Sequence, residues 1–296
     1  MNNESNLREY EILPQATDKR IDDWLESHYV AIDNSLPPQQ KLFLFLCGSH
    51  GNPSNQHLII QQAASLGYHA INLRYPNSWK IGDYCRRSNE ANCYENLRQT
   101  VIYGSQNSGT DKLKISRANS LENRLVRLLI YLYEKYPDDG WGNYLAGLSP
   151  RWESIMVAGH SQGGGHAAMI AKDNVVAKVI MFTSPGDYYR RSRTVANWLG
   201  KDHATPTDRY YGFVHSQEQN LEKILRSWEF LGIDEYGEPV NVDMESPPYN
   251  YSHQLITSAE INSSKVHGSV VVDEVTPKLV DGKPLYHQVW KYLLNA

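Results

Sequence analysis

Ten residues near the middle of the chain constrain its fold more than any other stretch, because they set one serine among several glycines. The stretch runs from Val157 to His166 and reads V-A-G-H-S-Q-G-G-G-H, with Ser161 as its serine. The apolar residues 155–158 before it are typical of a buried strand, and the small and apolar residues 163–172 after it are typical of a helix. A strand, a tight turn and a helix in this order favour a backbone that holds the hydroxyl of Ser161 outward as a nucleophile.

A glycine-rich loop can also bind phosphate, and this is the alternative interpretation of the stretch. The spacings G-x-G-x-x-G and G-K-[ST], which carry that function, are absent from it. The nucleophile interpretation is therefore the one that we develop.

Strand and helix signals alternate along the chain, which is typical of a mostly parallel sheet with helices on both faces. We expect strands at residues 41–47, 68–73, 154–158, 176–182, 210–214 and 252–257, and helices at residues 58–66, 121–136, 163–172, 219–231 and 285–294. The apolar spacing of residues 18–31 predicts an amphipathic helix. The pattern predicts one domain over residues 1–296, with an N-terminal extension (1–40) and a lid-like insertion (187–208) between two strands.

With these elements in place, the sequence resembles the α/β-hydrolase superfamily of serine hydrolases, esterases and lipases. G-H-S-Q-G between a strand and a helix of small residues is similar to that family's nucleophile elbow, and the resemblance extends from about residue 41 to the C-terminus. It implies an active site at the C-terminal ends of the strands and a catalytic triad in the order serine, acid, histidine. Of the family's first two antiparallel strands, only residues 9–13 offer a candidate here.

A serine hydroxyl needs a base to take its proton, so a histidine must reach Ser161. The family order places this histidine beyond the last main strand, which leaves His267 and His287. His287 lies in the apolar stripe of the closing helix, whereas His267 is followed by a glycine in a polar loop. We therefore predict His267 as the base, and we interpret His160 and His166 beside the serine as packing residues.

The triad also needs an acid that orients the histidine and stabilises its charged form. The resemblance points to the turn after the strand at residues 210–214, where Glu218 stands. Asp187 is the alternative acid, one strand earlier, at a place that some lipases of the superfamily use.

The anionic intermediate of such a reaction needs N–H donors, which form an oxyanion hole. One is the amide of Gln162, the residue after the nucleophile. The resemblance assigns the other to the amide of Ser49, just after the first glycine that follows the strand at residues 41–47.

Charge and composition exclude several classes of partner. The net charge of −4 gives no basic footprint for nucleic acid, and no apolar run reaches the length of a membrane span. The polar N-terminal sequence lacks a secretion signal, so we expect a cytoplasmic protein, with a secreted mature form as the alternative. Cys85 and Cys93 form either a loop-closing disulfide or two free thiols, and the spacing does not decide between them. The sequence gives no indication of the oligomeric state.

We expect a serine hydrolase that cleaves a carboxylic ester of a small molecule through an acyl-enzyme, with no metal or organic cofactor. The alternatives are a non-catalytic hydrolase-like binding domain and a related chemistry, namely a thioesterase, an amidase or an acyltransferase. Arg190, Arg191 and Arg193 in the insertion either attract an anionic substrate or form a solvated face. Tyrosines and tryptophans near the insertion either line an acyl pocket or pack within it.

Overall fold

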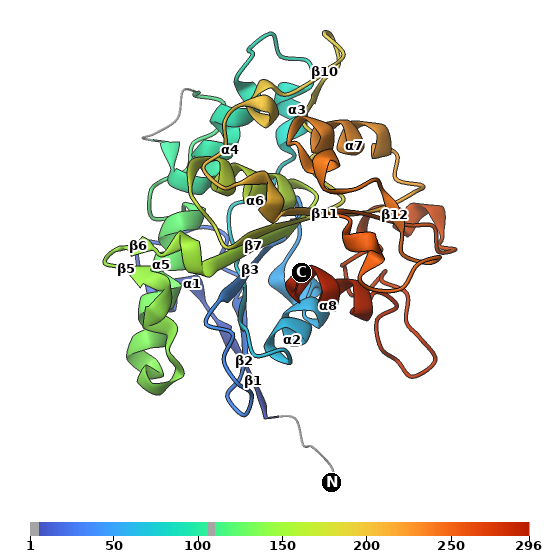
Figure 1. The fold of residues 1–296 in the computed structure, drawn as a ribbon. Coiled ribbons are helices and arrows are strands. Elements are labelled where there is room, and N and C mark those ends of the chain that lie inside the picture. Colours follow the sequence, from blue (N-terminus) through green and yellow to red (C-terminus); the bar gives the residue numbers. More distant parts are fainter. Residues whose placement is uncertain (1–5, 106–109, 296) are drawn as a thin grey trace.

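The fold is built on one large central sheet (Figure 1), seen in a computed structural model that describes residues 6–105 and 110–295. The strands of this sheet lie in the order β1 (Leu7–Ile12), β2 (His28–Asp33), β4 (His69–Asn72), β3 (Leu42–Leu46), β7 (Ile155–His160), β8 (Lys178–Phe182), β11 (Tyr210–His215), β13 (Gln254–Thr257) and β12 (Val240–Asn241). From β4 to β12 neighbouring strands are parallel, while β2 is antiparallel to both β1 and β4. This is the α/β-hydrolase fold, and the predicted fold class is confirmed.

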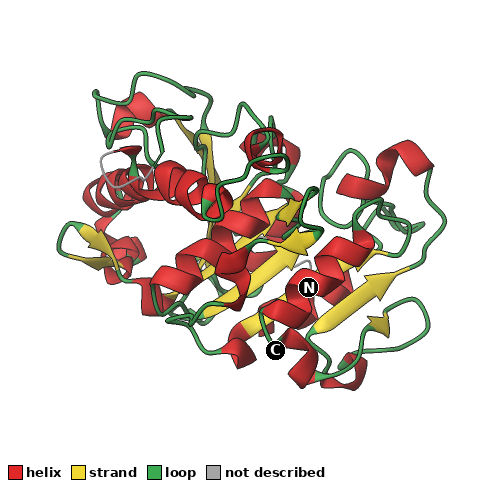
Figure 2. Ribbon diagram, turned by 90° about the horizontal axis from the view of Figure 1, so that it is seen from above, coloured by secondary structure: helices red, strands yellow, loops and turns green. Residues whose placement is uncertain are grey.

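Helices cover both faces of the sheet, as Figure 2 shows from above. Their bounds are α1 (Pro14–Thr17), α2 (Leu58–Ala64), α3 (Ile81–Cys85), α4 (Cys93–Tyr103), α5 (Leu121–Lys135), α6 (Gln162–Asp173), α7 (Leu221–Phe230) and α8 (His287–Asn295). Helices α2 and α8 pack on one face, and α4, α5 and α6 pack on the other. Two short ribbons, β5 (Leu145–Ala146) with β6 (Ser149–Pro150) and β9 (Tyr188–Tyr189) with β10 (Thr194–Val195), lie outside the sheet.

Strand β3 explains why the sheet is buried on both faces. Its side chains alternate, so that Leu42, Leu44 and Leu46 join the core under α4–α6 while Phe43 and Phe45 join the core under α2 and α8. All five are fully buried. A continuous apolar run is what such a doubly covered parallel strand requires, and it is why this strand was predictable.

The helix predicted over residues 18–31 is wrong. Residues 28–33 form β2, which pairs with β1 on one side and β4 on the other. Just before it, Trp24 has a left-handed backbone (φ 49°), and the carbonyls of Asp23 and Trp24 accept hydrogen bonds from the buried Arg124 guanidinium, at 2.5 and 2.9 Å. Tertiary partners therefore take the backbone groups that a helix would use, and residues 7–33 form an edge of the sheet rather than an extension to it.

Helices α3 and α4 carry the two cysteines whose pairing the spacing left open. Cys85 ends α3, Cys93 begins α4, and the two form a disulfide with a sequence separation of 8. The bridge fixes the short α3 against α4, and both cysteines are buried in the core. Neither helix was expected, because the five residues of α3 give little apolar periodicity and the polar residues 83–93 are typical of a loop.

We expect the double variant Cys85→Ala/Cys93→Ala to be less stable by about 2–3 kcal/mol, because a bridge that closes a short loop restricts the unfolded chain. Thermal unfolding of the variant and of the unreduced parent would measure this difference. Substituting the buried Cys47 with alanine leaves the disulfide intact and serves as a comparison for the loss of buried sulfur. Equal melting temperatures for the double variant and the parent would contradict the expectation.

The segment at residues 187–208 follows β8, leads into β11, and contains β9, β10 and a short 3₁₀ turn, Asn197–Gly200. It is attached through Tyr189, whose hydroxyl donates to the carbonyls of Glu90 and Ala91 at 3.0 and 2.8 Å. Its role as a lid stays a prediction. None of the helices in the part of the chain that the structure describes is both long and apolar enough to cross a membrane.

Candidate active site

Ser161 occupies the sharp turn between β7 and α6, at the centre of the sheet. Its backbone has φ 53° and ψ −117°, a conformation that a residue with a side chain rarely adopts. The amide of Ser161 is held by the carbonyl of Phe182 in β8, at 2.8 Å. The surrounding sheet therefore imposes the strained turn, which leaves the side chain of Ser161 on the wall of a cavity.

The glycines of the motif are explained by how closely backbones approach one another at this turn. A Cβ on Gly159 would lie 2.3 Å from the carbonyl carbon of Gly163, and a Cβ on Gly163 would lie 2.1 Å from the carbonyl oxygen of Leu46. Both distances are far below van der Waals contact. The sequence signal of several glycines around one serine thus reflects a turn that no larger residue allows.

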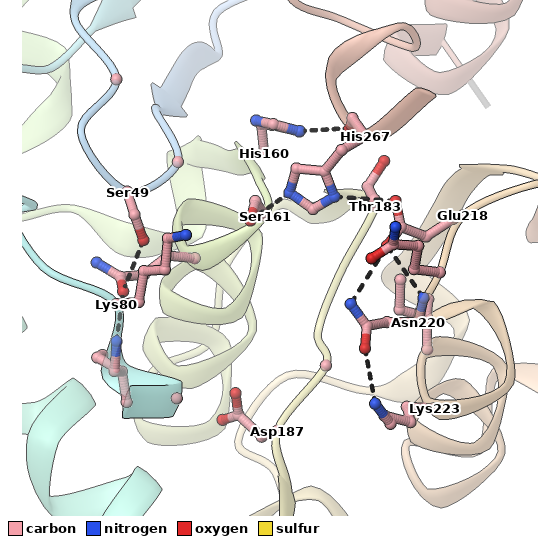
Figure 3. A pocket seen from close by; sticks show the side chains of 18 of the residues that line it. Ser49, Lys80, His160, Ser161, Thr183, Asp187, Glu218, Asn220, Lys223 and His267 are labelled. Carbon is pink, nitrogen blue, oxygen red and sulfur yellow. Dashed lines mark hydrogen bonds and ion pairs between the residues drawn. The ribbon is translucent and has the colours of Figure 1, made fainter. Parts of the chain in front are cut away.

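Two hydrogen bonds connect the serine, a histidine and a carboxylate (Figure 3). The hydroxyl of Ser161 donates to Nε2 of His267 at 2.9 Å, and Nδ1–H of His267 donates to Oε2 of Glu218 at 2.9 Å. The side chain of His267 is 51% exposed, whereas that of Glu218 is only 4% exposed. The structure therefore brings together the three residues predicted as nucleophile, base and acid, from three different loops, with the base facing the cavity and the acid shielded.

Glu218 is oriented by a residue that the sequence did not single out. The backbone N–H and the side-chain amide of Asn220 donate to Oε1 of Glu218, at 3.1 and 3.3 Å, and Lys223 in turn donates to the amide oxygen of Asn220 at 2.7 Å. Burial pushes the pKa of Glu218 up, but the hydrogen bond and the charge of His267 outweigh it and hold this pKa below its usual value. Glu218 is thus kept ionised beside the imidazole.

Asp187, the alternative acid, is occupied elsewhere. Its two carboxylate oxygens accept hydrogen bonds from the Arg98 guanidinium at 2.6 and 2.7 Å, and the indole N–H of Trp198 also donates to it, at 2.9 Å. Arg98 and Asp187 are 3% and 5% exposed. Arg98 further donates to the carbonyl of Gln162 at 3.1 Å, so this buried ion pair supports the first turn of α6 instead of orienting His267.

The two amides predicted to hold an oxyanion both belong to residues on the cavity wall. Gln162 is the first residue of α6, so its N–H has no partner within the helix. The side-chain oxygen of Gln162 accepts from the hydroxyl of Ser49 at 3.1 Å and from the N–H of Ile81 at 2.9 Å. These contacts fix the loop of Ser49 beside the turn of Ser161, which is where a second donor is needed.

His160 supports the loop that carries His267. Its Nε2–H donates to the backbone carbonyl of His267 at 2.8 Å, and burial lowers the pKa of His160 to about 3. At neutral pH His160 is therefore an uncharged positioning residue. His166 is fully buried in α6, in line with its interpretation as a packing residue.

We expect His160→Leu to lower kcat about tenfold while leaving the pH dependence of kcat/KM in place, because the lost hydrogen bond loosens the His267 loop but His160 does not titrate near neutrality. Rates measured from about pH 5 to pH 9 would check this. His287→Leu, a matched change at a histidine on α8 outside the cavity, should leave both quantities close to those of the parent. If the decrease of kcat/KM at low pH disappeared in His160→Leu but not in the parent or in His287→Leu, this role for His160 would be contradicted.

The cavity in front of Ser161 has a volume of about 980 Å³ and reaches from the loop of Ser49 to α7. Of the aromatic residues near the insertion, Tyr188 lines it, whereas Tyr189, Trp198, Tyr210 and Tyr211 are packed in the core. The cavity wall is instead rich in charged and amide side chains. These include Lys80 and Asn220, which no local sequence pattern marks because they reach the cavity only through the folding of distant segments.

Comparisons with known proteins find similar structures but no matching family. No model of a protein family matches the sequence, and no curated protein matches it either. The chain is similar to esterase B from Lactobacillus rhamnosis (TM-score 0.49, 10% identity, 98% of this chain and 86% of that one). It is also similar to S-formylglutathione hydrolase from Staphylococcus aureus (TM-score 0.47, 11% identity, 98% of each chain covered). A third similar structure is a putative dienelactone hydrolase from Klebsiella pneumoniae (TM-score 0.45, 10% identity, 98% of this chain and 99% of that one).

Proposed function

We propose that this protein is a serine hydrolase that cleaves a carboxylic ester through an acyl-enzyme. The observation that carries the proposal is the chain of two 2.9 Å hydrogen bonds from Ser161 through His267 to Glu218, at a strained turn that opens on a cavity. A hydroxyl, an imidazole and a buried carboxylate in this order are the groups that acyl transfer requires.

In the first half of the reaction, His267 removes the proton of Ser161 as its oxygen attacks the ester carbonyl. Glu218 holds Nδ1–H of His267, which leaves Nε2 free to accept that proton, and stabilises the imidazolium that results. The amides of Gln162 and Ser49 donate to the carbonyl oxygen as it becomes an anion. His267 then gives its proton to the departing alcohol, and the acyl group stays on Ser161.

In the second half, water takes the place of the alcohol. His267 removes a proton from the water, the resulting hydroxide attacks the acyl carbonyl, and the proton passes to the oxygen of Ser161 as the acid leaves. The same groups also cleave thioesters and amides, or pass the acyl group to another acceptor. An ester is the substrate that we propose, and the experiment below separates it from a thioester and an amide.

A fluorophosphonate probe, followed by mass spectrometry of peptides, tests for an activated serine. We expect one label, on Ser161, and turnover of para-nitrophenyl esters with a burst of para-nitrophenol in the first turnover. Rates on an ester, a thioester and an anilide with the same acyl group then rank the three chemistries, and we expect the ester to be fastest.

A folded protein that takes no label and turns over no ester would overturn the proposal in favour of a non-catalytic binding domain. A thioester or an anilide that reacts faster than its matched ester would keep the serine mechanism and correct the substrate class.

A further inference from the structure

The charges on the cavity wall differ from the charge of the chain as a whole. The protein carries a net charge of −4, yet the cavity is lined by five lysine or arginine side chains (Lys80, Arg86, Arg98, Arg190 and Lys223) against three carboxylates (Asp187, Glu218 and Glu274). A site of this composition attracts anions that the rest of the surface repels.

Two of the three carboxylates are already engaged by positive groups. Asp187 forms the buried ion pair with Arg98, and Glu218 binds His267, which becomes positive during the proposed reaction. Glu274 is the third, on an exposed stretch of the wall. After these pairings, cations remain in excess around the space where a substrate would lie.

Lys80 stands next to the proposed oxyanion donors. It directly precedes Ile81, whose N–H donates to the side chain of Gln162 at 2.9 Å. Figure 3 shows Lys80 beside the loop of Ser49, with Lys223 on the other side of the pocket. Within residues 6–105 and 110–295, Lys80 takes part in no ion pair.

Arg86 and Arg190 extend the same wall. The guanidinium of Arg86 folds back along α3, where its Nε donates to the carbonyl of Gly82 at 2.8 Å. The same guanidinium forms an ion pair with Asp83, whose side chain is 60% exposed. The backbone N–H of Arg190 donates to the carbonyl of Arg86 at 2.8 Å. Arg190 is exposed, and its side chain forms no ion pair with any residue that the structure describes.

From this arrangement we propose that the natural substrate of the hydrolase is an ester that carries a second, negatively charged group, a carboxylate or a phosphate, bound by Lys80 and Arg190 beside Ser161. The inference rests on the proposed hydrolase function and adds its substrate class. Among the residues that the structure describes, neither Lys80 nor Arg190 has an ion-pair partner, so an anion bound beside the attacking hydroxyl would meet two positive charges that no carboxylate neutralises.

Two matched pairs of chromogenic esters test the inference. Para-nitrophenyl hexanoate and mono-para-nitrophenyl adipate have equal acyl chains, and only the adipate ends in a carboxylate. Para-nitrophenyl acetate and its ring-carboxylated analogue place the charge on the leaving group instead. We expect kcat/KM for the charged ester of at least one pair to exceed that of its neutral partner about tenfold, and the excess to shrink as ionic strength rises.

Substitutions test whether Lys80 and Arg190 on the cavity wall cause the preference for the charged ester. In Lys80→Gln and in Arg190→Gln, the ratio of kcat/KM for the charged ester to that for the neutral ester should fall about tenfold. Arg191→Gln is the matched control, because Arg191 lies one residue away but donates to Asn89 at 2.8 Å and does not line the cavity, so its ratio should equal that of the parent. Glu274→Gln should raise the ratio. All four side chains are exposed, and melting temperatures would verify that the variants fold.

The outcomes separate the two proposals. Turnover of the neutral esters without preference for either charged ester, or a preference that Lys80→Gln and Arg190→Gln leave intact, overturns the inference while the hydrolase function stands. Failure to turn over any of the esters, together with the absence of a fluorophosphonate label, overturns the proposed function and the inference with it.

Discussion

Substituting Ser161 with alanine is expected to lower kcat on an activated ester by about a million-fold, and to leave the fold unchanged. The reason is chemical, because alanine removes the oxygen that would form the acyl-enzyme, and His267 and Glu218 then have no nucleophile to activate. The methyl group of alanine fits where the serine side chain stood, although the strained backbone of the turn remains.

Steady-state rates and fluorophosphonate labelling, each compared with the parent, measure this effect. Ser54→Ala is a matched control, because Ser54 is exposed and lies outside the cavity in front of Ser161. If the Ser161→Ala protein kept even a tenth of the parent's rate after purification from a host without endogenous esterase, Ser161 would not be the nucleophile.

Substituting Glu218 with glutamine is expected to lower kcat by about ten-thousand-fold. Glutamine has nearly the same shape but no charge, so it neither stabilises the imidazolium nor holds Nδ1 of His267 as the protonated nitrogen. The amide of glutamine can donate to Nδ1, which would put the proton on Nε2, the nitrogen that must accept from Ser161. The serine would then face a donor instead of a base.

Asp187→Asn distinguishes this effect from the loss of a buried charge. Removing one partner of the Arg98–Asp187 pair leaves an uncompensated buried cation, and we expect a loss of about 3–5 kcal/mol in stability. Per folded molecule, its kcat should fall much less than that of Glu218→Gln. If kcat fell more in Asp187→Asn than in Glu218→Gln, Asp187 would be the catalytic acid, and the hydrogen bond between Glu218 and His267 would not be required for catalysis.

The parts of this protein that could be predicted from its sequence are those fixed by local chemistry. The turn at Ser161 is marked by glycines that no other residue can replace, and β3 is marked by an apolar run. His267 and Glu218 were located through the resemblance to the α/β-hydrolase superfamily, whose order of serine, acid and histidine places each of them after a strand of the sheet that carries Ser161.

Elements fixed by distant contacts could not be predicted in this way. Strand β2 pairs with a strand on each side. It was mistaken for part of a helix because apolar residues recur at helical spacing over residues 18–31, although only residues 28–31 of that stretch belong to the strand. Asn220 matters through its contact with Glu218, and Arg98 through Asp187 and Gln162. Such residues carry no local pattern, since their roles depend on which segments meet after folding.

Gln162 connects the proposed catalytic groups to the proposed substrate-binding wall. Its main chain offers the N–H that would receive the oxygen's charge, while its side chain ties down both the loop of Ser49 and the start of α3 next to Lys80. A substitution of Gln162 would change both the catalytic rate and the substrate selectivity, so neither property could evolve independently at this position. Arg190, on the outer insertion, is free of that coupling, and it is where selectivity can drift, or be engineered, while the chemistry is preserved.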